Sequence, residues 1–266
     1  MLHEILRAHG GRLPDDVIVA FANTGKEHMK TLRFVHECET RWSVRIHWVE
    51  WRKGARGFEL VGYNSASQRG EPFRALIESK QRLPNGHERW CTEYLKVLPI
   101  FALMRHQLGL EPGGYEEVIG LRDDEGLRIF SGMERAAKTG RSVTYPLAKA
   151  KVRKDDVWRF WLGENLDARR LGHPLPQGFD LGLHPWEGNC DFCFLKGKGI
   201  RKRIIRDNMV VPAWWAAREL STGGQFDKRD SVEDLIAQVR KTPSLFDSAD
   251  DEEYDVECGL HCGEAA

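Results

Sequence analysis

The chain has 266 residues, of which 40 are basic and 40 acidic, so its formal net charge is zero. This balance excludes an overall field that selects nucleic acid or an anionic membrane surface as partner, and local basic clusters must be judged separately. Hydrophobic residues make up 41% of the chain, yet no apolar run reaches the length of a membrane span and the N-terminus shows no secretory pattern. We therefore expect a cytoplasmic protein with no membrane partner, whose six cysteines serve metal binding or thiol chemistry rather than structural disulfides.

The first two-thirds of the chain alternates strand-like and helix-like segments. Residues 17–21 form a short apolar run, typical of a strand buried on both faces of a parallel sheet, and a helical pattern follows over 27–41. Residues 44–51 alternate and predict a second strand, 53–70 predict a loop, and 117–121 predict a further strand. The pattern predicts an α/β fold with a mainly parallel sheet.

Two groups of polar residues follow predicted strands. Asn23-Thr24-Gly25 comes directly after the first strand, and ligands of open parallel sheets bind beyond the carboxyl ends of the strands. Arg122 and Arg128 follow the strand at 117–121, and their forked guanidinium groups suit phosphate or sulfate. An ordinary strand-to-helix turn and a salt-bridged exposed turn explain the same residues equally well.

The composition of the sequence changes at about residue 172. Glycine and proline become frequent, which predicts irregular chain, followed by one helix over 231–240 with Ser231 as its N-cap. A basic run over 196–206 is either a solvated surface, an attractor for an anionic group, or an RNA contact.

The cysteines fall into three groups. Cys190 and Cys193 are two residues apart, a spacing that zinc sites, iron–sulfur sites and redox dithiols share, and Cys91, Cys258 and Cys262 are further potential ligands. Cys38 lies on the apolar face of a predicted helix, where we expect a buried, inert thiol. Cys258 lies near the C-terminus between charged and flexible neighbours, which suits a nucleophile, although a tail cysteine without a role has the same appearance.

Together these segments resemble the phosphoadenylyl-sulfate (PAPS) reductase family, part of the PP-loop ATP-pyrophosphatase-like group. Asn23-Thr24-Gly25 is similar to the family's Asp-Thr-Gly turn after its second strand. Glu257-Cys258-Gly259-Leu260-His261 matches the reductases' C-terminal catalytic signature and is the most specific match. The other similar segments are Trp90-Cys91 with Leu95-Lys96-Val97 and Pro99, Gly120-Leu121-Arg122 with Asp124-Glu125 and Arg128, Pro146-Leu147 with Asp155-Asp156-Val157-Trp158, and Cys190-x-x-Cys193.

The resemblance implies a fold and a reaction. The fold is a Rossmann-like three-layer sandwich of the adenine nucleotide alpha hydrolase-like type over residues 1–171, with a cysteine-containing cluster-binding region and a mobile catalytic tail over 172–266. The reaction is that of an oxidoreductase: Cys258, with His261 beside it, attacks the sulfur of a sulfonucleotide (PAPS or APS), and thioredoxin or glutaredoxin releases sulfite. The residues implied to bind the sulfonucleotide or adenine nucleotide are Asn23, Thr24, Gly25, Lys96, Arg122 and Arg128. The residues implied to hold a 4Fe-4S cluster, or alternatively zinc, are Cys91, Cys190, Cys193 and Cys262.

Three departures from the family pattern stand out. The Ser-Gly-Gly-x-x-Ser loop that cradles pyrophosphate is missing, and we expect that a strand and this loop have been lost upstream of Met1. Trp90 stands where the family has the first cysteine of a pair, so Cys262 is expected to replace it as a ligand. Asn23 replaces the usual aspartate, which removes a charge near the site. These departures suggest a divergent relative carried by a mobile element.

Two other functions stay open at this point. A sulfur transferase of the same fold, modifying tRNA or DNA, would track the nucleic acid backbone with the basic run over 196–206. A metal-binding regulatory module that has lost nucleotide binding is the non-enzymatic alternative.

Overall fold

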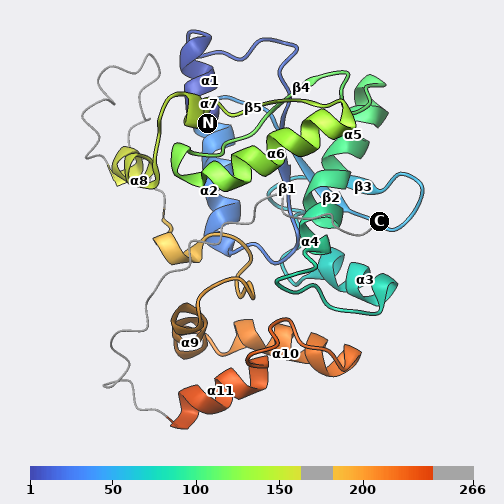
Figure 1. The fold of residues 1–266 in the computed structure, drawn as a ribbon, viewed down its shortest axis with the longest axis vertical. Helices are drawn as coiled ribbons and strands as arrows, with labels where there is room; N and C mark the ends of the chain where they lie inside the picture. The colour runs from blue at the N-terminus through green and yellow to red at the C-terminus, as the bar shows by residue number, and fades with distance from the viewer. Residues whose placement is uncertain (163–181, 242–266) are drawn as a thin grey trace.

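The structure, a computed structural model, describes residues 1–162 and 182–241, which form a mixed α/β protein (Figure 1). The strands are β1 (Val19–Ala22), β2 (Ile46–Trp51), β3 (Phe58–Val61), β4 (Glu116–Val118) and β5 (Ser142–Thr144). The helices up to residue 162 are α1 (Leu2–Ala8), α2 (Met29–Arg41), α3 (Glu71–Lys80), α4 (Trp90–Thr92), the π-helix η1 (Glu93–Val97), α5 (Leu98–Leu108), the 3-10 helix η2 (Asp123–Glu125), α6 (Gly126–Thr139), α7 (Pro146–Lys149) and α8 (Lys154–Leu162). Those from residue 182 onward are the 3-10 helix η4 (Pro185–Glu187), α9 (Lys198–Asp207), α10 (Val210–Thr222) and α11 (Val232–Lys241). No helix in these two ranges is long and apolar enough to cross a membrane.

The larger sheet has the order β1-β2-β3. β1 runs parallel to β2, with Val19 opposite Ile46, and β3 runs antiparallel to β2, with Val61 opposite Trp48. β1 and β2 confirm the strands predicted at 17–21 and 44–51. The loop predicted over 53–70 was wrong, because it contains β3, a four-residue strand whose order depends on its pairing with β2.

Helices cover both faces of this sheet. Side chains of a strand alternate between its two faces, so one set faces α1 and α2 and the other faces α5. The first face contains Val19, Phe21, Ile46 and Trp48, packed with Leu6, Leu32 and Cys38. The second contains Ala20, Ala22, Val49 and Leu60, packed with Ile100, Ala102 and Leu103. The carboxyl end of β1 is thereby fixed between two apolar layers.

The second sheet consists of β4 and β5, which run parallel with Glu116 opposite Ser142. β4 confirms the strand predicted near 117–121. The α/β class and the mainly parallel pairing are confirmed in the described strands. The five strands form two sheets rather than one, however, and the Rossmann-like three-layer sandwich stays a prediction.

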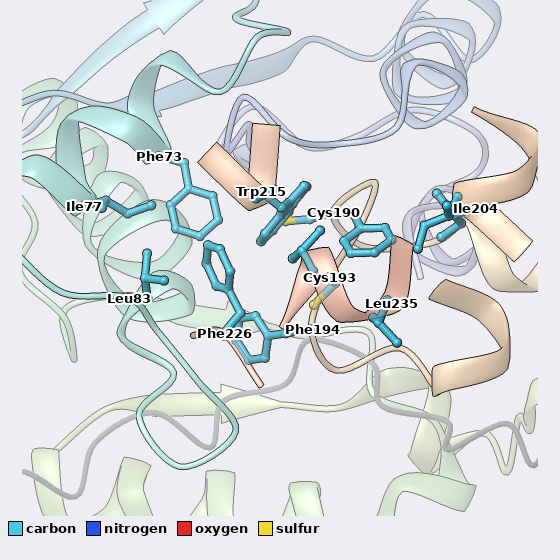
Figure 2. Packing of buried hydrophobic residues seen from close by; sticks show 14 of the residues in the cluster. Phe73, Ile77, Leu83, Cys190, Cys193, Phe194, Ile204, Trp215, Phe226 and Leu235 are labelled. Atoms are coloured by element: carbon cyan, nitrogen blue, oxygen red, sulfur yellow. The ribbon is translucent and has the colours of Figure 1, made fainter. Parts of the chain in front are cut away.

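The helices α9, α10 and α11 pack together at one end of the molecule, close to α3 and α4 (Figure 1). Phe73 and Ile77 of α3 lie opposite Trp215 and Phe226 in one hydrophobic core (Figure 2). The prediction of irregular chain was therefore wrong for residues 198–222, which are largely helical. α11 confirms the last predicted helix, and Ser231 Oγ accepts a hydrogen bond from the Asp234 amide at 3.1 Å, as an N-cap does. The predicted domain boundary at 171 lies outside the described residues.

Candidate functional site

The turn that follows β1 is buried and rigidly held. Asn23 is fully buried; its Nδ2 donates to Glu50 Oε1 at 2.7 Å and to the Ser67 carbonyl at 2.8 Å, while its Oδ1 accepts from the Gly25 amide at 3.1 Å. Gly25 has a φ of +78°, and a Cβ there would lie 2.7 Å from Pro72 Cδ. Only glycine fits this position, because both the backbone conformation and the lack of space exclude a side chain.

Glu50 is the buried carboxylate behind this turn. It is fully buried on β2, and besides Asn23 it accepts from the Ser67 amide and hydroxyl, both at 2.6 Å, and from Arg52 Nη2 at 2.8 Å. Four donors compensate a carboxylate that burial would otherwise make costly. Asn23 was predicted to remove a charge from the site, and its neutral amide lies against the Glu50 carboxylate.

The segment that carries Cys190 and Cys193, called the cysteine loop below, contacts the same turn. Glu27 and Cys190 form an isolated antiparallel bridge, and the Asp191 amide donates to the Lys26 carbonyl at 2.7 Å. Thr24 Oγ1 lies 3.6 Å from Cys190 Sγ, and both atoms are buried. Two segments that are 166 residues apart in the chain therefore share one site. The structure brings together residues that the sequence assigned separately to substrate binding and to metal binding.

A buried ion pair fastens the loop to the turn. Lys26 Nζ lies 2.7 Å from Asp191 Oδ2, and Trp215 Nε1 donates to Asp191 Oδ1 at 2.9 Å. The Lys26 ammonium also lies 4.9 Å from the centroid of the Trp214 ring, which adds a cation–π contact. Burial raises the pKa of Asp191, and Lys26 opposes that rise. The pair therefore holds two desolvated charges at the junction.

Lys96 reaches the turn from the π-helix η1. Its Nζ lies 3.2 Å from Glu27 Oε1, which also accepts from Thr24 Oγ1 at 3.3 Å. Single-turn π-helices occur frequently at functional sites, because they displace side chains from helical register. The structure thus places Lys96 beside Thr24, while its role in binding a sulfonucleotide stays a prediction.

Three of the four predicted cluster ligands contribute to one core. Cys190 and Cys193 are buried among aromatic side chains (Figure 2), and Cys91 of α4 packs against the same core. Lys196 is buried beside the pair and donates to the carbonyls of Trp186, at 2.7 Å, and Gly188. Burial lowers the pKa of Lys196, and the neighbouring Cys193 and Cys190 counteract that effect.

The donor set within the described residues is incomplete. No three His, Cys, Asp or Glu side chains in residues 1–162 and 182–241 are arranged to hold a metal ion. Cys190, Cys193 and Cys91 contact one hydrophobic core without forming such a group, so their role as cluster ligands stays a prediction. The fourth predicted ligand, Cys262, and the predicted catalytic residues Cys258 and His261 lie outside the described residues. The position of Trp90 is clear: its indole fills the core beside Phe73.

Arg122 and Arg128 pair with two carboxylates, those of Asp124 and Glu125. Arg122 Nε lies 3.0 Å from Asp124 Oδ1, and its Nη1 lies 3.6 Å from Glu125 Oε2. Arg128 also pairs with Glu125. These contacts are those of the salt-bridged turn that the sequence left open. An anion at this place would have to compete with two carboxylates.

Cys38 confirms the prediction of a buried thiol on α2. Burial raises its pKa from an ordinary 9.0 to about 12. Three pH units correspond to a thousandfold lower thiolate fraction at pH 8, so we expect iodoacetamide to label Cys38 about a thousand times more slowly in the folded than in the unfolded chain. Peptide mass spectrometry of native and urea-treated protein measures both rates. Folded-state labelling within tenfold of the unfolded rate would contradict the burial of this thiol.

Several residues at the junction were not predicted from the sequence as site residues. These are Lys26, Glu27, Glu50 and Asp191, whereas Lys196 was considered as part of the basic run over 196–206. A usable signal existed for three of them. Lys26 and Glu27 continue the polar turn after an apolar strand, where charged residues gather at a sheet's carboxyl end. Glu50 interrupts the apolar positions of β2, which marks a buried polar group in need of partners.

Comparison with known proteins gives one weak similarity. No family model matches the chain, and no solved structure matches it. The chain is similar to a phage protein. The uncharacterized nin region protein ORF290 of Escherichia phage lambda is 25% identical over 193 residues, which cover 70% of this chain. The matched part spans only 58% of the length of that relative, whose name states no activity.

Proposed function

We propose that this chain is a PAPS/APS reductase-like enzyme. The observation that carries the proposal is the 3.6 Å approach of Cys190 Sγ to Thr24 Oγ1, which joins the cysteine loop to the turn after β1. The turn after β1, which we propose binds the nucleotide, and the loop that carries the thiols then belong to one site. The similarity to a phage protein agrees with the expectation of a chain carried by a mobile element, while that relative's name states no activity.

The described residues supply binding and positioning. The turn residues Asn23, Thr24 and Gly25 would face the nucleotide, with Lys96 as the cation that reaches the turn from η1. The ligand set of a 4Fe-4S cluster would be Cys91, Cys190, Cys193 and Cys262, with zinc as the alternative. A cluster bound there would connect the cysteine loop to α4.

The proposed reaction has two steps. The Cys258 thiolate attacks the sulfur of the sulfonucleotide, an S–S bond forms, and the bond between sulfur and the phosphate oxygen breaks to release the nucleotide. One thiol of thioredoxin or glutaredoxin then attacks the sulfur of Cys258, and sulfite leaves with the bonding electrons. A second reductant thiol closes a disulfide, which restores the Cys258 thiol. Lys96 would stabilise the leaving nucleotide's charge in the first step.

The nucleic acid alternative receives less support from α9. Arg201 is buried and pairs with Asp227 at 2.7 Å, and Lys198 pairs with Asp230 at 3.0 Å. Arg203 lies over the Trp186 ring, 4.7 Å from its centroid. Much of the basic run therefore stabilises the helical region rather than forming one open cationic stripe.

The test is anaerobic purification of wild type and two variants, with visible absorption, iron, sulfide and zinc analysis, and sulfite release from PAPS and APS in the presence of thioredoxin. We expect Cys258→Ser to keep the metal and to lose at least a thousandfold in sulfite release. We expect Cys190→Ser to lose the metal, while Cys38→Ser, the matched control, changes neither property. Wild type without sulfite release from either substrate rejects the reductase proposal, and loss of metal in Cys258→Ser makes that cysteine a ligand.

A further inference from the structure

A cavity of about 780 Å³ lies beside β1, lined by side chains of β1, α1, α2, α7 and α8. Its volume falls within the roughly 300–1,000 Å³ of small-molecule sites. Neither the turn after β1 nor the cysteine loop contributes to its lining. A ligand bound there would therefore be distinct from the substrate of the candidate site.

The lining is apolar in its interior and charged at its opening. The lining side chains with polar groups belong to α1 and to the chain around the start of α8, and they are His3, Glu4, Arg7, Lys151 and Asp156. Every other lining side chain is apolar. The side chains of Arg7 and Lys151 are 46% and 79% exposed, whereas Ile46 and Leu147 on the apolar wall are buried. Arg7 and Lys151 therefore lie where the cavity meets the solvent.

The interior suits a hydrocarbon. Trp161 is the centre of an aromatic wall, with its ring centroid 4.9 Å from those of Phe34 and Phe160 and 6.0 Å from that of Trp42. A polar group placed against such a wall would give up its hydrogen bonds to water without replacement. The part of a ligand that enters the cavity must therefore be apolar.

The carboxylates of the lining already have partners on both oxygens. Glu4 Oε1 lies 3.3 Å from His3 Nδ1, and Glu4 Oε2 accepts from Arg7 Nε at 3.1 Å and from Arg7 Nη2 at 2.9 Å. Asp156 Oδ1 accepts from Arg159 Nη2 at 2.8 Å, and its Oδ2 accepts from the Arg153 amide at 2.9 Å. A cationic head group would have to displace these donors.

The cations of the lining keep donors for an anion. Arginine has five N–H donors, and within the described residues Arg7 uses those of Nε and Nη2 on Glu4. Lysine has three donors, and Lys151 directs one at Asp123 Oδ1, 3.0 Å away. Donors that remain beside a hydrocarbon interior match a carboxylate on an apolar chain. We propose that the cavity binds an anionic amphiphile, with its hydrocarbon body against the aromatic wall and its carboxylate head beside Arg7 and Lys151.

The first test compares head groups and chain lengths on the full wild-type chain by calorimetry, below the micelle-forming concentration of each probe. We expect dodecanoate to bind at least tenfold more tightly than dodecyltrimethylammonium, which has the same chain and the opposite charge. Each buried methylene should tighten binding about fourfold, so dodecanoate should also bind at least tenfold more tightly than decanoate. Equal binding of the two head groups would overturn the proposed role of the cations, and no binding of dodecanoate would overturn the proposal.

The second test locates the head. The double variant Arg7→Gln/Lys151→Gln should bind dodecanoate at least tenfold more weakly and dodecyltrimethylammonium no more weakly than wild type does. Arg82→Gln, which changes an exposed cation outside the lining, is the matched control and should alter neither affinity. Unchanged dodecanoate binding by the double variant would contradict the proposal. Should that variant not fold, the comparison of head groups on wild type decides.

The third test locates the chain. Dodecanoate with a diazirine at its methyl end should, on irradiation, label peptides that contain residues 19–21 or 34–38, because both segments line the interior. Peptide mass spectrometry identifies the labelled positions. Labelling confined to peptides outside the lining would place the probe elsewhere and overturn the proposal. None of these outcomes depends on reductase activity.

Discussion

Replacing Asn23 by aspartate is expected to destabilise the folded protein by about 3–5 kcal/mol at pH 8, the range found when a buried charge loses its partner. The substitution preserves the shape of the side chain but turns the Nδ2 donor, 2.7 Å from Glu50 Oε1, into an acceptor. Two carboxylates then share a fully buried site and compete for one proton. Urea unfolding at pH 5 and pH 8 measures the loss.

The pH dependence and a double variant make this prediction specific. Like-charge proximity raises the pKa of the carboxylate pair in the folded state above its unfolded value, so stability is lost as the pH rises through the folded pKa. The loss should therefore be larger at pH 8 than at pH 5. Asn23→Asp combined with Glu50→Gln exchanges amide and carboxylate, and we expect it to recover at least half of the lost stability. An equal loss at both pH values would show that charge is not the cause.

Replacing Lys26 by methionine is expected to cost about 3–5 kcal/mol at pH 8, because it leaves Asp191 buried without its cation. Burial already raises the pKa of Asp191 in the folded chain. Without Lys26 that pKa rises further, so the variant gains stability relative to wild type as the pH falls and the carboxylate takes up a proton. Thermal or urea unfolding at pH 5 and pH 8 tests both the size and the sign.

A double-mutant cycle separates the ion pair from packing. Asp191→Asn keeps the acceptor for Trp215 Nε1 and removes the charge. The double variant Lys26→Met/Asp191→Asn should therefore be more stable than Lys26→Met alone, with a coupling of about 1–3 kcal/mol. Additive losses would mean that the 2.7 Å contact contributes nothing beyond the space each side chain fills.

The sequence predicts those parts of the fold whose signal is local. The apolar run at 17–21 and the alternation at 44–51 correspond to β1 and β2, since burial on two faces leaves its own pattern in the residues. β3 and β5 are four and three residues long, and their order depends on a neighbouring strand that no local pattern reveals. α9 was missed for another reason. Its basic residues indicate surface, yet Arg201 is buried because Asp227, 26 residues later, neutralises it.

The candidate site likewise has features that a local sequence pattern predicts and features that depend on distant residues. The position of the Asn23-Thr24-Gly25 turn follows from the end of an apolar strand and was predictable. Its partners were not, because Glu50, Asp191 and Lys96 reach it from three separate segments. Spacing within a motif predicted that Cys190 and Cys193 act together, but it carries no information on where the pair docks. Arg122 and Arg128 illustrate the opposite case, in which a local cationic pattern is matched by local carboxylates.

The contact between Thr24 and Cys190 also sets a time order during synthesis. A ribosome that adds about 5–20 residues per second delivers Cys190 roughly ten to thirty seconds after Thr24, given the 166 residues between them. During that interval Lys26 lacks its partner Asp191, and Glu27 lacks its bridge to Cys190. The thiols therefore meet the turn only after most of the protein has emerged. A prematurely terminated chain carries the turn but no Cys190–Cys193 pair beside it.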